Sequence, residues 1–160
     1  MGVGKTTACR QLQQLLDRSV FLDGDWCWDA HPFQVTEETR EMVLENIAFL
    51  LNSFLRCSAY DHVIFCWVLH RREIWADLLR RLTEPYALRA VSLVCTPEAL
   101  RARLEGDIRA GVRQPDAVDR SLAYLPLYDA LDVRRLDVTD LTPRAAAERI
   151  LADTEKEREP

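Results

Sequence analysis

The run Gly2-Val3-Gly4-Lys5-Thr6-Thr7 at the start of the chain constrains the fold more than any other feature of the sequence. It matches the second half of the phosphate-binding loop motif G-x-x-x-x-G-K-[ST]. Glycines let the backbone curl so that successive N–H groups face one anion. Lys5 then supplies a point charge for the β- and γ-phosphates, and the hydroxyl of Thr6 is placed to bind Mg²⁺. The sequence therefore predicts that a nucleotide is bound by Gly2, Val3, Gly4, Lys5, Thr6 and Thr7.

An amphipathic helix is expected directly after this loop. Apolar residues recur at helical spacing within Thr6–Asp17, and the N-terminal end of a helix attracts anions. The glycine-rich run would also suit a flexible N-terminal tail, but the amphipathic helix that follows favours the phosphate loop. The first glycine of the motif and the hydrophobic strand that usually precedes it would lie before Met1. We therefore expect that a first strand, about 5–10 residues long, is missing from this chain.

The composition limits the class of protein. The chain has 160 residues, of which 48% are hydrophobic and 29% charged, so we expect one globular domain covering residues 1–160. Its net charge of −5 argues against a general nucleic-acid or membrane-surface binder. The longest apolar runs, such as Val63–Leu69, are too short to span a bilayer. With no visible signal peptide and no C-x-x-C pair, a cytoplasmic location with reduced thiols is expected.

Strand and helix patterns alternate along the chain, which indicates an α/β fold with a parallel sheet covered by helices on both faces. The expected strands are Ser19–Leu22, Asp61–Leu69, Leu88–Cys95 and Val133–Val138. After the first helix, the expected helices begin at the caps or first turns Thr36, Glu73, Thr96, Asp116 and Thr142.

Four motifs, in their order, resemble those of the small P-loop kinases. They are G-V-G-K-T-T, the D-G-D that follows the first expected strand, T-P-E-A-L-R-A-R-L from Thr96, and D-V-T-D from Asp137. The chain is similar to the nucleotide- and shikimate-kinase-like superfamily, including its tunicamycin-resistance kinases. The resemblance implies a P-loop NTPase fold with sheet order 2-3-1-4-5. The strands Asp61–Leu69 and Leu88–Cys95 would then flank the missing strand.

The resemblance gives roles to Asp23 and Asp25. In such kinases one carboxylate of a D-x-D pair helps to hold Mg²⁺, and the other holds the acceptor hydroxyl or takes its proton. Here Asp23 is assigned to the metal and Asp25 to the acceptor. The strand Asp61–Leu69 lacks the acid of a second Walker motif and has Cys66 and Trp67 where one would be sought. The alternative is a solvated turn, because D-G-D is also good turn chemistry.

Three arginines fall where these kinases carry a mobile lid, here about residues 103–116. Arginine is always charged and forks onto phosphate oxygens. The resemblance therefore implies that Arg109 and Arg113 are catalytic and that Arg103 binds the nucleotide. The alternative for each is an ordinary exposed arginine.

These features together predict a phosphotransferase that uses ATP and Mg²⁺ and moves the γ-phosphate to a small-molecule hydroxyl or phosphate. The expected catalytic residues are Lys5, Asp25, Arg109 and Arg113. The expected partners are a nucleotide and a small acceptor, with no nucleic acid and no membrane. The aromatic segment Trp26–Phe33 would wall the acceptor pocket or belong to the core. The alternative function is nucleotide binding without kinase turnover, as in a sensor or an inactive relic.

Overall fold

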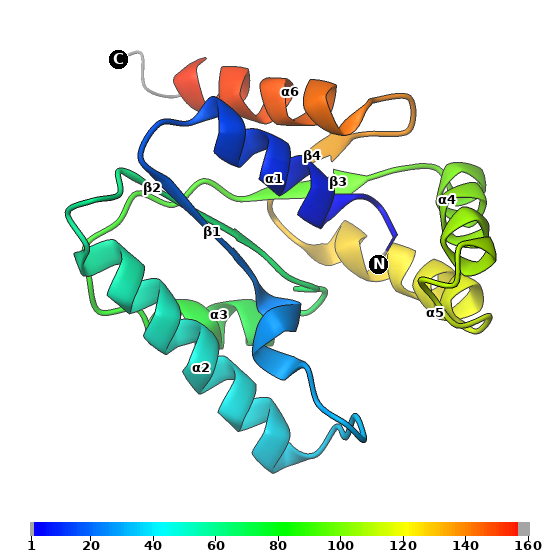
Figure 1. The fold of residues 1–160 in the computed structure, drawn as a ribbon, viewed down its shortest axis with the longest axis horizontal. Helices are drawn as coiled ribbons and strands as arrows, with labels where there is room; N and C mark the ends of the chain where they lie inside the picture. The colour runs from blue at the N-terminus through cyan, green and yellow to red at the C-terminus, as the bar shows by residue number, and fades with distance from the viewer. Residues whose placement is uncertain (1, 157–160) are drawn as a thin grey trace. The chain divides into compact units, whose positions relative to one another are not determined.

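The computed structural model of the chain describes residues 2–156 and divides into two compact units (Figure 1). We call Met1–Leu12 with Arg89–Pro160 the loop unit, and Gln13–Leu88 the acid unit. Within residues 2–156, no helix combines the length and the apolar composition needed to cross a membrane.

The acid unit is built on two parallel strands. Strand β1 (Ser19–Asp23) pairs with β2 (His62–Cys66), in a register that runs from Ser19 opposite His62 to Asp23 opposite Cys66. Helix α2 (Glu37–Arg56) begins at the predicted cap, where the Thr36 hydroxyl accepts a hydrogen bond from the Thr39 N–H at 3.1 Å. Helices α2 and α3 (Arg72–Arg80) contact each other beside the strands (Figure 1). Their shared core consists of Leu22, Val43, Leu44, Ile47, Ala48, Leu51 and Leu78.

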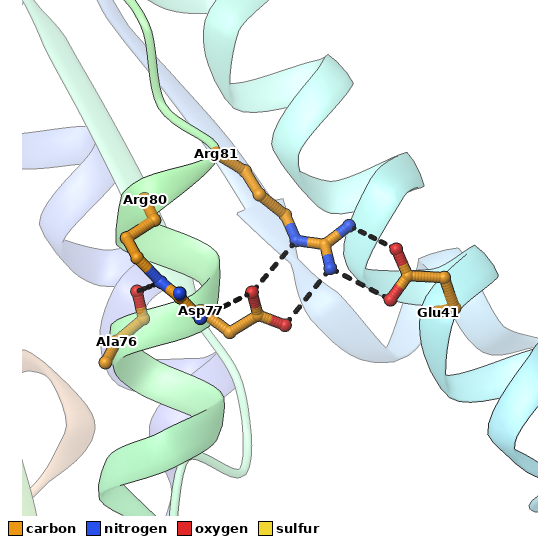
Figure 2. Close-up of polar contacts among 5 residues, drawn as sticks. All are labelled: Glu41, Ala76, Asp77, Arg80 and Arg81. Atoms are coloured by element: carbon orange, nitrogen blue, oxygen red, sulfur yellow. Dashed lines mark hydrogen bonds and ion pairs between the residues drawn. The ribbon is translucent and has the colours of Figure 1, made fainter.

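An ion-pair network joins α2 to the end of α3 (Figure 2). The Arg81 guanidinium donates to both oxygens of Glu41, at 2.7 and 2.9 Å, and to Asp77 at 3.1 Å. The hydrogen bonds from Arg81 lower the pKa of Glu41, and the charge of Arg81 adds to this. Asn52 on α2 also donates to the Arg81 carbonyl at 2.9 Å. The bidentate geometry fixes the angle at which α3 meets α2 more specifically than apolar packing alone would.

The loop unit contains the other parallel pair. Strand β3 (Val91–Val94) pairs with β4 (Arg134–Asp137), with Val91 opposite Arg134 and Val94 opposite Asp137. The helices of this unit are α1 (Lys5–Leu15), which continues into the acid unit, α4 (Pro97–Arg109), α5 (Ala117–Tyr124) and α6 (Pro143–Lys156). Helix α4 starts at the predicted Thr96 cap, whose hydroxyl accepts from the Ala99 N–H. The core is made by Ala8, Cys95, Leu100, Leu104, Ala117, Val118, Leu136, Val138 and Ala146.

The predicted α/β fold with parallel strands is confirmed, whereas some strand ends differ from those expected. The second expected strand ends at Cys66 rather than Leu69, because its partner β1 ends at Asp23, where the 3₁₀ helix η1 (Gly24–Trp28) begins. Within the described residues β1 pairs with β2 and β3 with β4, which are the pairs that the expected strand order makes neighbours, and β2 and β3 do not pair.

Candidate functional site

The backbone of the phosphate loop has the conformation that its glycines predict. Gly2 has a φ of +74° and Gly4 a φ of +96°, values that residues other than glycine rarely adopt. A Cβ at Gly2 would lie 2.5 Å from Cδ2 of Leu104 and 3.2 Å from Cδ1 of Leu100, both on α4. Gly2 is therefore required twice, once by its dihedral angle and once by the closeness of α4.

Lys5, Thr6 and Thr7 form the first turn of α1. The Gly4 carbonyl accepts from the Ala8 N–H at 2.9 Å, so the helix follows the loop without a break. Lys5 is half-buried and the two threonines are exposed. The first turn of α1 carries no acidic residue, so no local carboxylate opposes an anion there. A Cβ built on Gly4 would meet no atom within 4 Å, which leaves open space beside the loop. These features fit a bound phosphate group.

Arg103 extends from α4 to backbone carbonyl groups. Its guanidinium donates to the carbonyl oxygens of Val3 at 3.3 Å, Val138 at 2.6 Å and Thr139 at 2.9 Å. These acceptors come from two places: the phosphate loop and the connection that follows β4. Arg103 was predicted from the sequence to bind the nucleotide, and the contacts that the structure gives it are with the protein backbone.

A second set of hydrogen bonds orders the carboxyl ends of β3 and β4. The hydroxyl of Thr139 accepts from the Thr96 N–H at 3.0 Å, and the Asp137 carboxylate accepts from the Thr139 N–H at 2.8 Å. Hydrogen bonds from Thr139, first through its side chain and then through its backbone, lower the pKa of Asp137, and the charge of Arg103 adds to this. The D-V-T-D segment is therefore held in one conformation at the edge of the sheet.

The remaining two arginines of the predicted lid have different surroundings. Arg109 is the last residue of α4 and is exposed. Arg113 lies beyond the helix, and its Nε donates to the Asp107 carboxylate at 2.9 Å. Between them Gly111 has a φ of +72°. The first half of the segment 103–116 is thus helical, and the second half is an irregular connection to α5.

Asp23 and Asp25, the two acids of the acid unit, flank Gly24, and the side chain of Trp67 packs against this glycine. Asp23 is only 5% exposed, and its carboxylate accepts from the Asp25 N–H at 3.1 Å. Asp25 is exposed in the first turn of η1. A Cβ on Gly24 would lie 2.5 Å from Cγ of Trp67, so only glycine fits between the two acids. Burial, and secondarily the charge of Asp23, raise the pKa of the Cys27 thiol, which keeps it protonated near neutral pH.

Aromatic side chains follow the acids, as the sequence predicts. Trp26 is 50% exposed and meets Phe21 edge-on, with ring centroids 5.3 Å apart. Phe33 is 60% exposed and lies 5.2 Å from Trp28 by the same measure. Trp28 packs against the core of the acid unit whereas Trp26 and Phe33 are exposed, so the segment Trp26–Phe33 serves the core in part and leaves apolar surface after Asp25.

A magnesium ion would find few protein ligands here. Among residues 2–156, no group of three or more His, Cys, Asp or Glu side chains is placed to hold a metal ion. Mg²⁺ commonly takes one or two protein ligands and fills its octahedron with water and substrate phosphates. The predicted pair, Thr6 and Asp23, supplies a hydroxyl and a carboxylate of the kind that Mg²⁺ prefers. Thr6 and Asp23 belong to different units, and their assignment to the ion stays a prediction.

The predicted residues therefore fall into two groups. Lys5, Thr6 and the three arginines belong to the loop unit, and Asp23 and Asp25 belong to the acid unit. That Trp67 covers Gly24 could not be predicted from the sequence, because no local pattern links two positions so far apart. A signal for the Arg103 contacts does exist, since Arg103 shares a helical face with Leu100 and Leu104.

A glycine loop followed by lysine and a helix, in a fold of parallel strands and helices, defines the P-loop nucleotide-binding class. Residues 1–120 match the family described as AAA domain, and the chain belongs to that family. None of the curated protein sequences matches the chain.

Several solved structures share the fold. The tunicamycin resistance protein of Deinococcus radiodurans is 17% identical, with a TM-score of 0.68 over 96% of this chain and 90% of that one. A gluconokinase from Sinorhizobium meliloti 1021 is 19% identical, with a TM-score of 0.63 over 100% of this chain and 93% of that one. A sugar kinase from Janibacter sp. HTCC2649 is 21% identical, with a TM-score of 0.67 over 96% and 89%. At these identities the likeness establishes the fold, in agreement with the resemblance noted in the sequence.

Proposed function

We propose that the protein transfers the γ-phosphoryl group of ATP to a hydroxyl or phosphate of a small molecule. The observation that carries the proposal is the phosphate loop, in which Gly2 and Gly4 have positive φ and Lys5 opens a helix whose first turn carries no acid. Neighbours in fold that are named as a gluconokinase and a sugar kinase support a small-molecule acceptor. The proposal includes a cytoplasmic location, which the free thiols of Cys27, Cys57 and Cys95 favour.

Each residue group has a role in this reaction. The loop N–H groups and Lys5 bind the β- and γ-phosphates and neutralise the charge that develops during transfer. Mg²⁺, when bound, would neutralise phosphate oxygens, and Thr6 and Asp23 would hold it. For a hydroxyl acceptor, Asp25 holds the hydroxyl and takes its proton. The acceptor oxygen then bonds to the γ-phosphorus, the bond to the bridging oxygen breaks, and ADP leaves. Arg109 and Arg113 would add charge to the transferring group.

The proposal is tested by measuring ADP formation with a panel of sugars, polyols, nucleosides, nucleoside monophosphates and aminoglycoside-type antibiotics. We expect one acceptor class to raise ADP formation well above the acceptor-free rate. Asp25→Asn should lower the acceptor-dependent rate by about 100-fold or more, the range found for general bases. Asp29→Asn is the matched control, since Asp29 is an exposed acid four residues further along the same segment. Equal loss in both variants, or none in Asp25→Asn, would refute the role of Asp25.

A second candidate is nucleotide binding without turnover. One observation favours it: β2 ends in Cys66, and Trp67 follows where a second Walker acid would be sought. A sensor of this kind would bind ATP with an intact Lys5 and lose binding in Lys5→Ala, but it would form no ADP with any acceptor. ADP formation that depends on an acceptor excludes this candidate.

A further inference from the structure

Arg103 is the residue through which α4 holds the phosphate loop by a polar contact. Its three acceptors are all backbone carbonyl oxygens, and one of them, Val3, belongs to the loop itself. Arginine has five N–H donors in a rigid fork, so one side chain can join segments that lie far apart in the sequence. Here it joins the loop at Val3 to the connection after β4 at Val138 and Thr139.

The contact with Val3 has a consequence for the next residue. The C=O of Val3 and the N–H of Gly4 belong to one planar peptide unit, and in the trans form they point in opposite directions. This bond is trans, because within the described residues the cis peptide is His31–Pro32. Fixing the Val3 oxygen on Arg103 therefore fixes the Gly4 N–H away from α4. Separately, a Cβ on Gly4 would meet no atom within 4 Å, so there is open space beside this residue.

We propose that Arg103 is a positioning residue that orients the Gly4 amide toward the phosphates of the bound nucleotide. This inference rests on the proposed function. It differs from a direct contact between Arg103 and phosphate, because Arg103 acts through the Val3–Gly4 peptide. The contacts with Val138 and Thr139 hold the guanidinium in place, because Thr139 is itself hydrogen-bonded to Thr96 and Asp137.

The contribution is measurable with inorganic tripolyphosphate, a probe that lacks the nucleoside. Arg103→Ala should weaken its binding by roughly tenfold or more, the equivalent of one hydrogen bond to a charged group. Arg103→Lys keeps the charge but replaces the planar fork with a compact ammonium. If Arg103 acts by positioning, the lysine variant should also lose roughly tenfold. The control is Arg101→Ala, two residues earlier on α4 and exposed, which should bind as the wild type does.

A nuclear magnetic resonance experiment reads the orientation directly. In ¹⁵N-labelled wild-type protein the Gly4 amide signal should move on addition of tripolyphosphate. In Arg103→Ala and Arg103→Lys that shift should be lost or strongly reduced, while glycine signals remote from the loop keep their positions. A change of overall stability alone would not move one loop amide selectively, and thermal unfolding of each variant shows whether it is folded at the temperature used.

The outcomes separate the two proposals. Wild-type protein that binds neither tripolyphosphate nor ATP overturns both. If the wild type binds and Arg103→Ala binds equally, only the positioning role is overturned. If Arg103→Lys restores wild-type affinity and the Gly4 shift, a direct charge contact replaces positioning. Should Arg103→Ala fail to fold, the lysine variant alone decides: loss of affinity and of the Gly4 shift supports the inference, and retention refutes it.

Discussion

Replacing Gly24 with alanine tests whether the tryptophan after β2 sets the position of the two acids. A Cβ at this position would lie 2.5, 2.7 and 2.9 Å from Cγ, Cδ1 and Cβ of Trp67. Carbon atoms normally approach to about 3.5–4.0 Å, so relief of the clash needs a displacement of about 1 Å. The nearest atoms belong to the stiff inner part of the side chain, and Trp67 packs against the core of the acid unit. The displacement must therefore be shared with the backbone of Gly24.

Two effects of known size follow from this displacement. Overpacking of this kind costs about 1–3 kcal/mol in the free energy of unfolding. The backbone of Gly24 also joins Asp23 to Asp25, whose hydrogen bond of 3.1 Å would not survive a shift of that size. A misplacement of about 1 Å near reacting atoms can lower a catalytic rate about 100-fold. We therefore expect Gly24→Ala to lose stability and, more strongly, acceptor-dependent ADP formation.

Urea unfolding of a double-mutant cycle measures the steric part. Trp67→Ala alone should cost about 3–5 kcal/mol. If Trp67 is the obstacle, the double variant Gly24→Ala, Trp67→Ala should be more stable than the sum of the single effects predicts, by about 1–2 kcal/mol. Stability of Gly24→Ala within about 0.5 kcal/mol of the wild type, or single effects that add within that margin, would refute the reasoning.

Three further predictions concern the acid unit. Thr36→Ala should lower its stability by about 1 kcal/mol in urea unfolding, because the first turn of α2 loses its cap, whereas Thr36→Ser should retain most of it. Ile47→Ala, at a fully buried position, should cost about 2–5 kcal/mol, and Ile47→Val about 1 kcal/mol. The hydrogen bond with Arg81 lowers the pKa of Glu41 from its ordinary value of 4.5. The stabilisation that the ionised carboxylate contributes is therefore complete above pH 4.5, and it is lost as the pH falls through the lower pKa of the folded state. The stability difference between wild type and Glu41→Gln should therefore be constant above about pH 6 and shrink in acid; a difference that grows in acid would contradict this sign.

The parts of the fold that follow from local patterns were predictable. The phosphate loop, the Thr36 and Thr96 caps and the alternation of strands with helices depend on residues that are neighbours in sequence. Strand ends were predicted less well. The apolar run Val63–Leu69 continues beyond Cys66, but β2 stops there because β1 has no residue left to pair with. Strand pairing depends on both segments, so the hydrophobicity of one segment does not predict where its pairing ends.

The contacts that position the candidate site were not predictable for the same reason. The hydrogen bond from Arg103 to Val3 joins residues 100 positions apart, and the contact of Trp67 with Gly24 joins residues from two different strand ends. The sequence nevertheless predicts which face of α4 carries Arg103. Leu100, Arg103 and Leu104 stand at i, i+3 and i+4, and residues at this spacing share one face of a helix.

An arginine on the same helical face as two core leucines needs polar partners, because a buried charge without hydrogen bonds is strongly unfavourable. The periodicity of α4 therefore indicates that Arg103 differs in kind from Arg101, which stands on the exposed side of the same helix. What the periodicity cannot supply is the identity of the acceptors, which the fold provides as carbonyl groups of the loop and of the connection after β4. One face of α4 thus supports the phosphate loop in two ways. Leu100 and Leu104 exclude any side chain at Gly2, and Arg103 holds the peptide between Val3 and Gly4. Changing either kind of contact should disturb the loop, but only the loss of the arginine should do so while the apolar core stays intact.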